Sequence, residues 1–272
     1  MQENHKTKLV LFDLDGTLVD TSPDFILSLN NVLVRNNRKP IKESLIRRHV
    51  SDGSAKLTEI GFNLPRNHFL FDGYRQELLD EYKNNLTTSS KIFDGIKELL
   101  DFLKSNEISF GIVTNKPLEY ARPVIENFIE LDNCKVLVCP DHVNKIKPDP
   151  EGILQACSKL SIDPSKTIYI GDHPKDLEAG MVPAIGAVFV NTTFDFVVFQ
   201  YVATGTLAVV PLTNGLAFFL LAPVATNMFL SNTPKPVVKF VTAAEPSMFN
   251  PIGKPANTEL KIETSQFLLK CI

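Results

Sequence analysis

KLVLFDLDGTLVD, at residues 8–20, is the stretch of sequence that decides the fold. Its apolar residues 9–12 form an unbroken run, which is typical of a strand buried on both faces of a parallel sheet. Asp13 and Asp15 follow, and side chains two residues apart project the same way from an extended chain. Two adjacent carboxylates repel each other and are costly to bury unpaired. The pattern therefore predicts either a metal or proton-transfer site or, as the simpler alternative, a strand followed by an acidic turn.

The composition narrows the class of protein. A chain of 272 residues holds one or two domains, and its net charge of -3 gives no basic surface for nucleic acid. The polar N-terminus, MQENHKTK, does not resemble a signal peptide. The four cysteines and five histidines show no zinc-ligand spacing, and free thiols are typical of a reducing cytosol. We therefore expect a cytoplasmic protein with no nucleic-acid partner and no zinc site.

Helical patterns follow the acidic motif, and no further strand pattern occurs before about residue 88. Apolar residues recur at helical spacing after Ser22, which we expect to cap the first helix. The turn RHVSDG, residues 48–53, lies between two later helices, and Ser51 or Asp52 is expected to cap the second of them. Backbone N–H groups in such a turn suit an anion, although a plain connector fits equally well. We expect a small helical unit over residues 21–88.

Strand and helix patterns alternate in the chain that follows. The apolar runs at residues 108–113, 135–139, 167–170 and 185–190 are typical of buried strands, and helical patterns separate them. Repeats of this kind build a parallel sheet with helices on both faces. The sequence therefore predicts an α/β fold in which the helical unit is inserted after the first strand.

Polar side chains follow the predicted strands at their carboxyl ends, where ligands bind in sheets of this class. Carboxylates suit magnesium, whereas a lysine and a hydroxyl suit a phosphate group. One carboxylate is then left to attack phosphorus and another to move a proton. Each residue alone fits a plain structural role, such as a strand end, a solvated lysine or a helix cap, and their joint order favours a site. These residues are Asp13, Asp15, Thr114, Asn115, Asp172 and Asp176 at the strand ends, and Lys147 in a loop that leads into a helix.

DLDGT, VTN, KPDP and GDHPKD, in this order, resemble the four signature motifs of the haloacid dehalogenase-like hydrolase superfamily. The resemblance covers about residues 8–190. It implies a Rossmann-like catalytic core, residues 1–20 and 89–190, with an inserted helical cap at residues 21–88. Residues 191–272 lie outside the resemblance and form a tail of unknown structure.

The resemblance also implies a role for each motif residue. Asp13 is expected to be the nucleophile and Asp15 the general acid/base, and the presence of Asp15 argues for phosphate chemistry rather than dehalogenation. The other implied roles are phosphate binding by Thr114, Asn115 and Lys147, and Mg2+ binding by Asp13, by Asp15 through its backbone carbonyl, by Asp172 and, in a supporting position, by Asp176.

Within the superfamily, the chain is most similar to the phosphoglycolate phosphatase subgroup. The turn with Arg48, Ser51 and Gly53 resembles that subgroup's substrate loop. We expect a magnesium-dependent phosphatase for a small phosphorylated metabolite, with 2-phosphoglycolate as the first candidate. A sugar phosphomutase that uses the same paired aspartates and a non-catalytic relative are the alternatives.

The C-terminal part departs from the family pattern. The segment after Asp176 reaches Met181 a few residues early, which predicts a shifted last strand. The tail that follows has only nine charged residues, and residues 196–234 have none. A membrane segment at 207–230 is disfavoured, because its longest clean apolar run falls short of the roughly 20 residues that a spanning helix needs. The tail is otherwise either an extra β-rich unit or a non-native reading frame joined near Val190, and we favour the reading frame.

Overall fold

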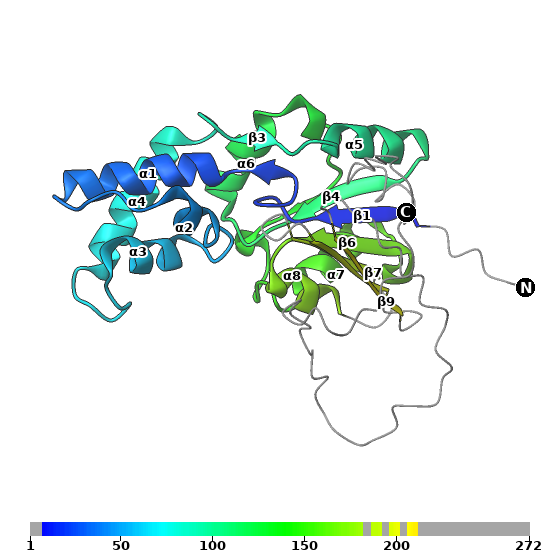
Figure 1. Ribbon diagram of the computed structural model, residues 1–272. Helices are drawn as coiled ribbons and strands as arrows, with labels where there is room; N and C mark the ends of the chain where they lie inside the picture. Colours follow the sequence, from blue (N-terminus) through cyan, green and yellow to red (C-terminus); the bar gives the residue numbers. More distant parts are fainter. Residues whose placement is uncertain (1–6, 182–185, 192–195, 202–205, 212–272) are drawn as a thin grey trace, which may run out of the picture.

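A computed structural model describes residues 7–181, 186–191, 196–201 and 206–211 (Figure 1). The last three stretches are described by their backbone only. Residues 1–6, 182–185, 192–195, 202–205 and 212–272, which include most of the disfavoured membrane segment at 207–230, lie outside the described residues. Within the described part, none of the helices is both long and apolar enough to cross a membrane.

A seven-stranded sheet forms the centre of the molecule, and its strand order is β5-β4-β1-β6-β7-β8-β9. The first five strands in this order pair in parallel, and β8 and β9 pair antiparallel. This arrangement confirms the predicted α/β class. The strands are β1 (Leu9–Phe12), β4 (Ser109–Val113), β5 (Leu137–Val138), β6 (Thr167–Gly171), β7 (Gly186–Asn191), β8 (Phe196–Tyr201) and β9 (Thr206–Pro211).

Helices cover both faces of the sheet because the central strand is apolar on both sides. Val10 and Phe12 of β1 share one hydrophobic core with α5 (Ile96–Ser105) and α6 (Leu118–Glu126). Leu9 and Leu11 point the other way and share a second core with α7 (Glu151–Leu160) and α8 (Pro174–Gly180). Figure 1 shows the sheet between α5 on one side and α7 and α8 on the other.

A helical insertion, which we call the cap, follows β1 and has a hydrophobic core of its own. The chain enters it through β2 (Val19–Asp20) and returns through β3 (Lys91–Ile92), and these two strands pair as an antiparallel ribbon. Buried Asp24 accepts hydrogen bonds from Ser89 N–H and Ser90 Oγ, which joins the two crossings. The domain limits expected from the sequence stay a prediction. The cap helices are α1 (Ser22–Arg35), α2 (Glu43–Arg47), α3 (Ser54–Phe62) and α4 (Phe71–Asn85).

Two predicted helix caps are wrong. Ser22 is the first residue of α1 rather than its cap, and its hydroxyl donates to Asp20. Gly53 precedes α3 with φ +88°, and no side chain caps that helix. Ser51 and Asp52 instead hydrogen-bond to residues of the α/β core. Contacts with residues far along the chain therefore outweigh local capping at this turn.

The sheet continues past the family-like part of the sequence. β7 pairs with β6 from Ile168–Gly186 to Gly171–Phe189, and the residues that join α8 to β7 lie outside the described part. β5 is shorter than the strand predicted at residues 135–139. β8 and β9 add two antiparallel strands, and the three interpretations of the tail stay predictions, since residues 212–272 are not described.

Candidate active site

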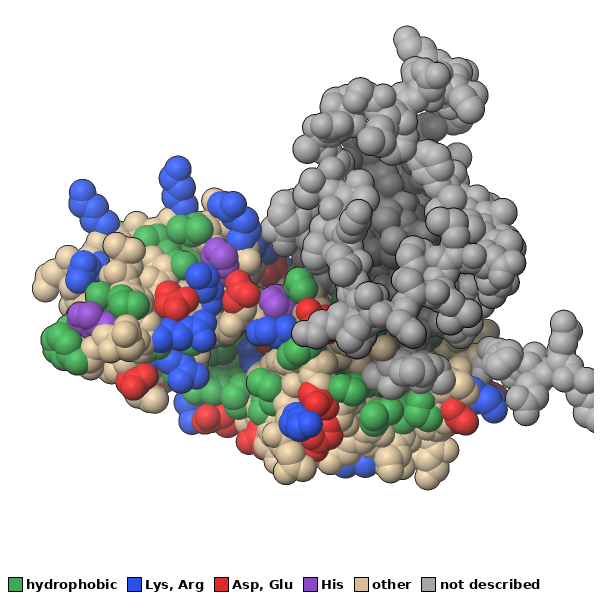
Figure 2. All heavy atoms as spheres, turned by 90° about the horizontal axis from the view of Figure 1, so that it is seen from below, with side chains coloured by type: hydrophobic (Ala, Val, Ile, Leu, Met, Phe, Trp, Pro, Cys, Tyr) green, Lys and Arg blue, Asp and Glu red, His purple; other side chains and the backbone are tan. Residues whose placement is uncertain are grey.

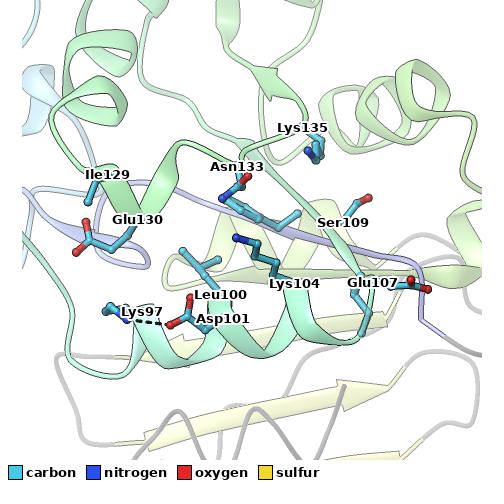
Figure 3. Close-up of a pocket in the computed structure, with 12 residues that line it drawn as sticks. Lys97, Leu100, Asp101, Lys104, Glu107, Ser109, Ile129, Glu130, Asn133 and Lys135 are labelled. Atoms are coloured by element: carbon cyan, nitrogen blue, oxygen red, sulfur yellow. Dashed lines mark hydrogen bonds and ion pairs between the residues drawn. The ribbon is translucent and has the colours of Figure 1, made fainter.

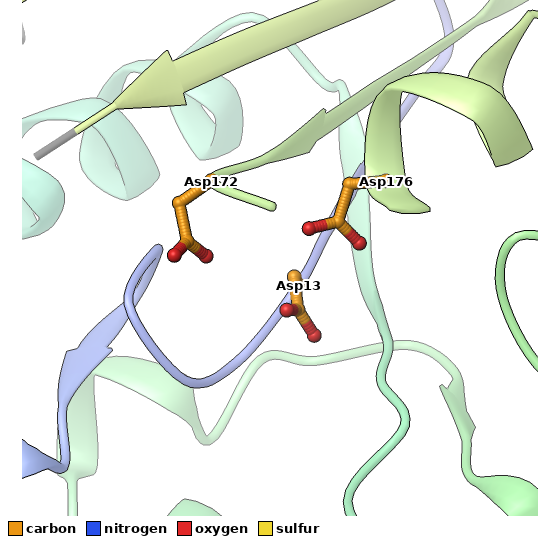
Figure 4. A group of neighbouring side chains, drawn as sticks. All are labelled: Asp13, Asp172 and Asp176. Atoms are coloured by element: carbon orange, nitrogen blue, oxygen red, sulfur yellow. The ribbon is translucent and has the colours of Figure 1, made fainter. Parts of the chain in front are cut away.

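Three carboxylates meet at the carboxyl ends of neighbouring strands. Asp13 follows β1, Asp172 follows β6, and Asp176 lies in the first turn of α8. One oxygen from each lies within 4.8 Å of the others, and Figure 4 shows the three side chains converging. β1 and β6 bring them together because they pair in parallel and end at the same edge of the sheet.

Lys147 places a buried positive charge between two of these carboxylates. Its Nζ lies 2.9 Å from Asp13 Oδ1 and 2.6 Å from Asp176 Oδ1, and its side chain is only 4% exposed. Burial by itself lowers the pKa of Lys147, but Asp13 and Asp176 raise it, and the net pKa lies above its usual value. Asn115 fixes the lysine's backbone, since its side chain donates to Lys147 O and accepts from Lys147 N–H.

The negative charge of the cluster exceeds what one lysine neutralises. Burial raises the pKa of Asp13 to about 6, Lys147 partly offsets this, and Asp176 adds to it. Burial, followed by Asp13 and Asp176, raises the pKa of Asp172 well above its usual value. Asp13 Oδ1 also has no hydrogen bond among the described residues, and Lys147 Nζ faces it as an ion pair at 2.9 Å. The site therefore favours a further cation.

The donor set fits a hard divalent cation such as Mg2+, which prefers carboxylate oxygens. Asp13, Asp172 and Asp176 are the residues that would hold it. Thr17 Oγ1 donates to Asp172 Oδ1 at 2.9 Å and so orients one of these ligands. Gly16, with φ +83°, lets the loop approach, since a Cβ there would lie 2.4 Å from Asp172 Oδ2. A bound cation would neutralise the cluster and withdraw charge from a phosphate group.

Asp176 also caps α8, which is the plain structural role that the sequence allowed for it. Its Oδ2 accepts the backbone N–H of His173, which closes a capping box at the start of α8. Its Oδ1 meanwhile accepts from Lys147 Nζ and from Tyr169 Oη. A Cβ on Gly171 would lie 2.4 Å from Asp176, so only glycine leaves room for this side chain.

Asp15 lies apart from the three-carboxylate cluster. Its Oδ1 accepts from Thr21 Oγ1 at 2.6 Å and from Lys116 Nζ at 2.9 Å. Its carboxylate is therefore engaged elsewhere, and the metal contact expected of its backbone carbonyl stays a prediction. The sequence did not identify Lys116 as a site residue. Nothing in its neighbouring residues distinguishes a buried lysine from a solvated one.

Thr114 directly follows β4 and lies on the same sheet edge as Asp13, since β4 and β1 pair in parallel. It is buried, its N–H donates to Val138 O at 3.0 Å, and its Oγ1 accepts from Lys116 N–H at 3.2 Å. The structure thus gathers Thr114 and the loop of Asn115 and Lys147 at the carboxylate edge. Their predicted phosphate contacts stay a prediction.

The turn at residues 48–53 brings the cap against the carboxylates. Ser51 Oγ donates to Asp172 Oδ2 at 3.0 Å, and Asp52 Oδ1 lies 3.2 Å from His173 Nε2. Arg48 is exposed, and its Nε donates to Ser44 O of its own segment. Of the three residues expected in the substrate loop, Ser51 therefore contacts the cluster directly, and Gly53 shapes the turn. Lysine and arginine side chains are spread over the cap on the face shown in Figure 2.

A separate cavity of about 420 Å³ lies at the other end of β4, near Ser109 and Phe110 (Figure 3). Charged residues of both signs line it, and two of them, Lys97 and Asp101, form an ion pair at 2.9 Å. Since Thr114 follows the opposite end of β4, this cavity is distant from the carboxylates. It carries no part of the chemistry described above.

The chain is similar in sequence to known proteins. A model of haloacid dehalogenase-like hydrolases matches residues 10–190. The chain is 41% identical over 175 residues to an N-acetylmuramic acid 6-phosphate phosphatase of Pseudomonas aeruginosa, which covers 64% of this chain and 77% of the relative. It is 33% identical over 172 residues to a phosphoglycolate phosphatase of Xylella fastidiosa, which covers 63% of this chain and 75% of the relative.

The fold is likewise found among solved structures. The crystal structure of a predicted phosphoglycolate phosphatase from Haemophilus somnus 129pt superposes with a TM-score of 0.60 at 26% identity, over 66% of this chain and 84% of that one. The family match extends over more than half of the chain and includes all four motifs that gather at the sheet edge. The chain belongs to the haloacid dehalogenase-like hydrolase family.

Proposed function

We propose that this chain is a magnesium-dependent phosphatase that hydrolyses a small phosphomonoester through an aspartyl-phosphate on Asp13. The observation that carries the proposal is the separation of the two aspartates of the first motif. Asp13 lies in a buried cluster with Lys147 and two further carboxylates, whereas Asp15 is held apart by its own lysine. One carboxylate is thus available for attack and the other for proton transfer.

In the first step, a carboxylate oxygen of Asp13 attacks phosphorus, and the bond between phosphorus and the leaving oxygen breaks. Asp15 gives a proton to that oxygen, and the alcohol departs. In this proposal Lys147, whose Nζ lies 2.9 Å from Asp13, balances the charge of the transferred phosphoryl group, and Thr114 donates a hydrogen bond to it. Magnesium, when bound, would supply further charge neutralisation.

In the second step, water attacks the phosphorus of the aspartyl-phosphate. Asp15, now a carboxylate, takes a proton from this water, and the bond between phosphorus and the Asp13 oxygen breaks. Inorganic phosphate leaves, Asp13 is again a carboxylate, and Asp15 again carries the proton. The balance needs no oxidant and no second substrate besides water.

For the substrate we propose N-acetylmuramic acid 6-phosphate first, ahead of the 2-phosphoglycolate that the sequence analysis favours. The support is the relative named for that sugar phosphate, which is 41% identical, against 33% for the relative named for phosphoglycolate. Both compounds are phosphomonoesters that carry a carboxylate, and both release an alkoxide oxygen that needs a proton. The cap turn at Ser51 and Asp52 closes over the cluster and is the surface on which selection between them would act.

The test is phosphate release by the purified full chain from a panel of phosphomonoesters, with Mg2+ and with excess chelator. We expect magnesium-dependent release, the largest kcat/KM with N-acetylmuramic acid 6-phosphate, and none from Asp13→Asn. Release that persists in chelator, or that survives in Asp13→Asn, would overturn the mechanism. A larger kcat/KM with 2-phosphoglycolate would overturn only the choice of substrate.

A further inference from the structure

We propose that Lys116 is a positioning residue that couples the cap to the carboxylate of Asp15. This inference rests on the proposed function, in which Asp15 moves protons. The backbone of Lys116 belongs to the core, since its N–H donates to Thr114 Oγ1 at 3.2 Å. Its side chain ends at Asp15 and at Tyr82, which is a residue of the cap helix α4. One side chain therefore joins the predicted phosphate loop, the proton carrier and the cap.

The ammonium group of Lys116 is buried, and its partners account for all of its donors. Nζ lies 2.9 and 3.3 Å from the two oxygens of Asp15 and 2.7 Å from Tyr82 Oη. An ammonium group has three N–H donors, and these three acceptors use them. Burial lowers the pKa of Lys116, but Asp15 and Tyr82 raise it, and the net pKa lies above its usual value. Lys116 is thus a cation committed to Asp15 and the cap, with no donor left for a phosphate.

Two cap helices fix the position of this cation. Phe25 of α1 and Tyr82 of α4 stack with ring centroids 3.7 Å apart and planes 9° apart. Lys116 Nζ lies 5.2 Å from the centroid of Phe25 and 4.8 Å from that of Tyr82, within the range of a cation–π attraction. A shift of α1 or α4 would therefore move the lysine's partners.

The remaining partner of Asp15 also lies at the entrance to the cap. Thr21, which donates to Asp15 Oδ1, immediately precedes α1. Among the described residues, both side chains that hydrogen-bond to the Asp15 carboxylate are thus tied to the cap. Asp13, by contrast, is paired with Lys147, whose partners all belong to the core. We therefore expect a shift of the cap to move the carboxylate of Asp15 and to leave the carboxylate of Asp13 in place.

The test is a comparison of Lys116→Met on two esters, an alkyl phosphate and 4-nitrophenyl phosphate. An alkyl leaving oxygen needs the proton from Asp15, whereas nitrophenolate leaves without it. kcat/KM reports the steps up to release of the leaving group, and the ratio of the two kcat/KM values does not depend on the folded fraction. We expect kcat/KM to fall at least about tenfold more on the alkyl ester, because general acid catalysis is worth 10²–10⁴-fold.

Three further variants complete the test. Tyr82→Phe removes one hydroxyl. It should lower kcat/KM about threefold more on the alkyl ester than on 4-nitrophenyl phosphate. Lys116→Arg keeps the charge and should recover part of the loss. Lys83→Met, at an exposed lysine of α4 that lies 3.3 Å from Glu119, is the matched control and should leave the ratio unchanged.

Equal loss on both esters in Lys116→Met would overturn the inference, because a phosphate ligand or a merely structural residue affects both alike. Asp15→Asn separates this failure from a failure of the proposed function. If Asp15→Asn shows the selective loss and Lys116→Met does not, only the positioning role is wrong. If Asp15→Asn lacks it, the acid role of Asp15 is wrong, and the inference falls with it.

Discussion

Asp13 and Asp15 are two residues apart and each pairs with a buried lysine, yet the two pairs have different surroundings. The pair of Asp13 and Lys147 is held by core residues alone. In the pair of Asp15 and Lys116, the lysine also donates a hydrogen bond to Tyr82 of the cap. The comparison teaches that the same pair of charges can be held in two ways, and in the proposed mechanism these give a fixed nucleophile at Asp13 and a cap-dependent proton carrier at Asp15. Each prediction tests one side of this difference.

Removal of the nucleophile should have the largest effect. Asp13→Asn is nearly isosteric and should abolish turnover, because an amide does not attack phosphorus. The variant should fold and, in chelator, unfold at a temperature no lower than the wild type, since it removes a charge that burial disfavours. Phosphate release would be measured beside thermal unfolding. A folded variant with wild-type activity would contradict the role of Asp13.

Removal of one metal ligand should come next in size. Asp172→Ala should greatly raise the Mg2+ concentration needed for half-maximal activity, because one of three clustered carboxylates is lost. Thr17→Val removes only the hydroxyl that donates to Asp172, so it should shift the same curve less. The measurement is activity against Mg2+ concentration for both variants. An unchanged curve in Asp172→Ala would exclude this residue from the metal site.

The core cluster should also make metal binding depend on pH. The pKa of Asp13 rises from 3.8 to about 6 on folding without metal. The folded protein therefore holds this proton between about pH 4 and 6, where the unfolded chain has lost it, and metal-free stability falls as pH rises through that window. Mg2+ must displace the proton below about pH 6.

Thermal unfolding with Mg2+ and with chelator, at about pH 5 and about pH 7.5, checks this expectation. Mg2+ should raise the Tm more at the higher pH. Asp13→Asn carries no titrating group at this position, so its response should vary less with pH. An equal rise at both pH values in the wild type would show that the Asp13 proton does not compete with the metal.

The cap turn should give the smallest effect. Gly53 has φ +88°, but a Cβ there would meet no atom within 4 Å, so the cost of Gly53→Ala is backbone strain of about 1–3 kcal/mol and not a clash. The turn that carries Ser51 should shift, and KM should rise several-fold. Gly73→Ala, in the first turn of α4 with the same open space, is the control and should leave KM unchanged. Equal KM values for the two variants would favour a plain connector.

The core and its site residues could be predicted because both depend on short-range patterns. The apolar run of residues 9–12 indicated a buried central strand, and the first, second and fourth motifs follow strands, whereas KPDP lies in a loop. Parallel neighbours end at one edge, so Asp13, Thr114 and Asp172 had to meet there. No knowledge of side-chain contacts was needed for that step.

What the sequence did not predict depends on partners distant along the chain. Lys116 is a buried cation because Asp15 and Tyr82 surround it, and these lie 101 and 34 residues away. Ser51 or Asp52 was expected to cap α3, but the Ser51 hydroxyl donates to Asp172, 121 residues away. The local sequence shows which hydrogen bonds a side chain can form with its neighbours. The fold decides whether a distant group takes the place of those neighbours.

The most direct test of the division between Asp13 and Asp15 is rapid mixing of Asp15→Asn with 4-nitrophenyl phosphate and Mg2+. Nitrophenolate leaves without a proton, so the variant should form the aspartyl-phosphate, but it lacks the base that activates water. We predict a burst of nitrophenolate equal to the enzyme, slow turnover afterwards, and a phosphoryl group found on Asp13 by mass spectrometry after acid quenching. No burst and no phosphoryl group on Asp13, in a folded variant, would contradict the account.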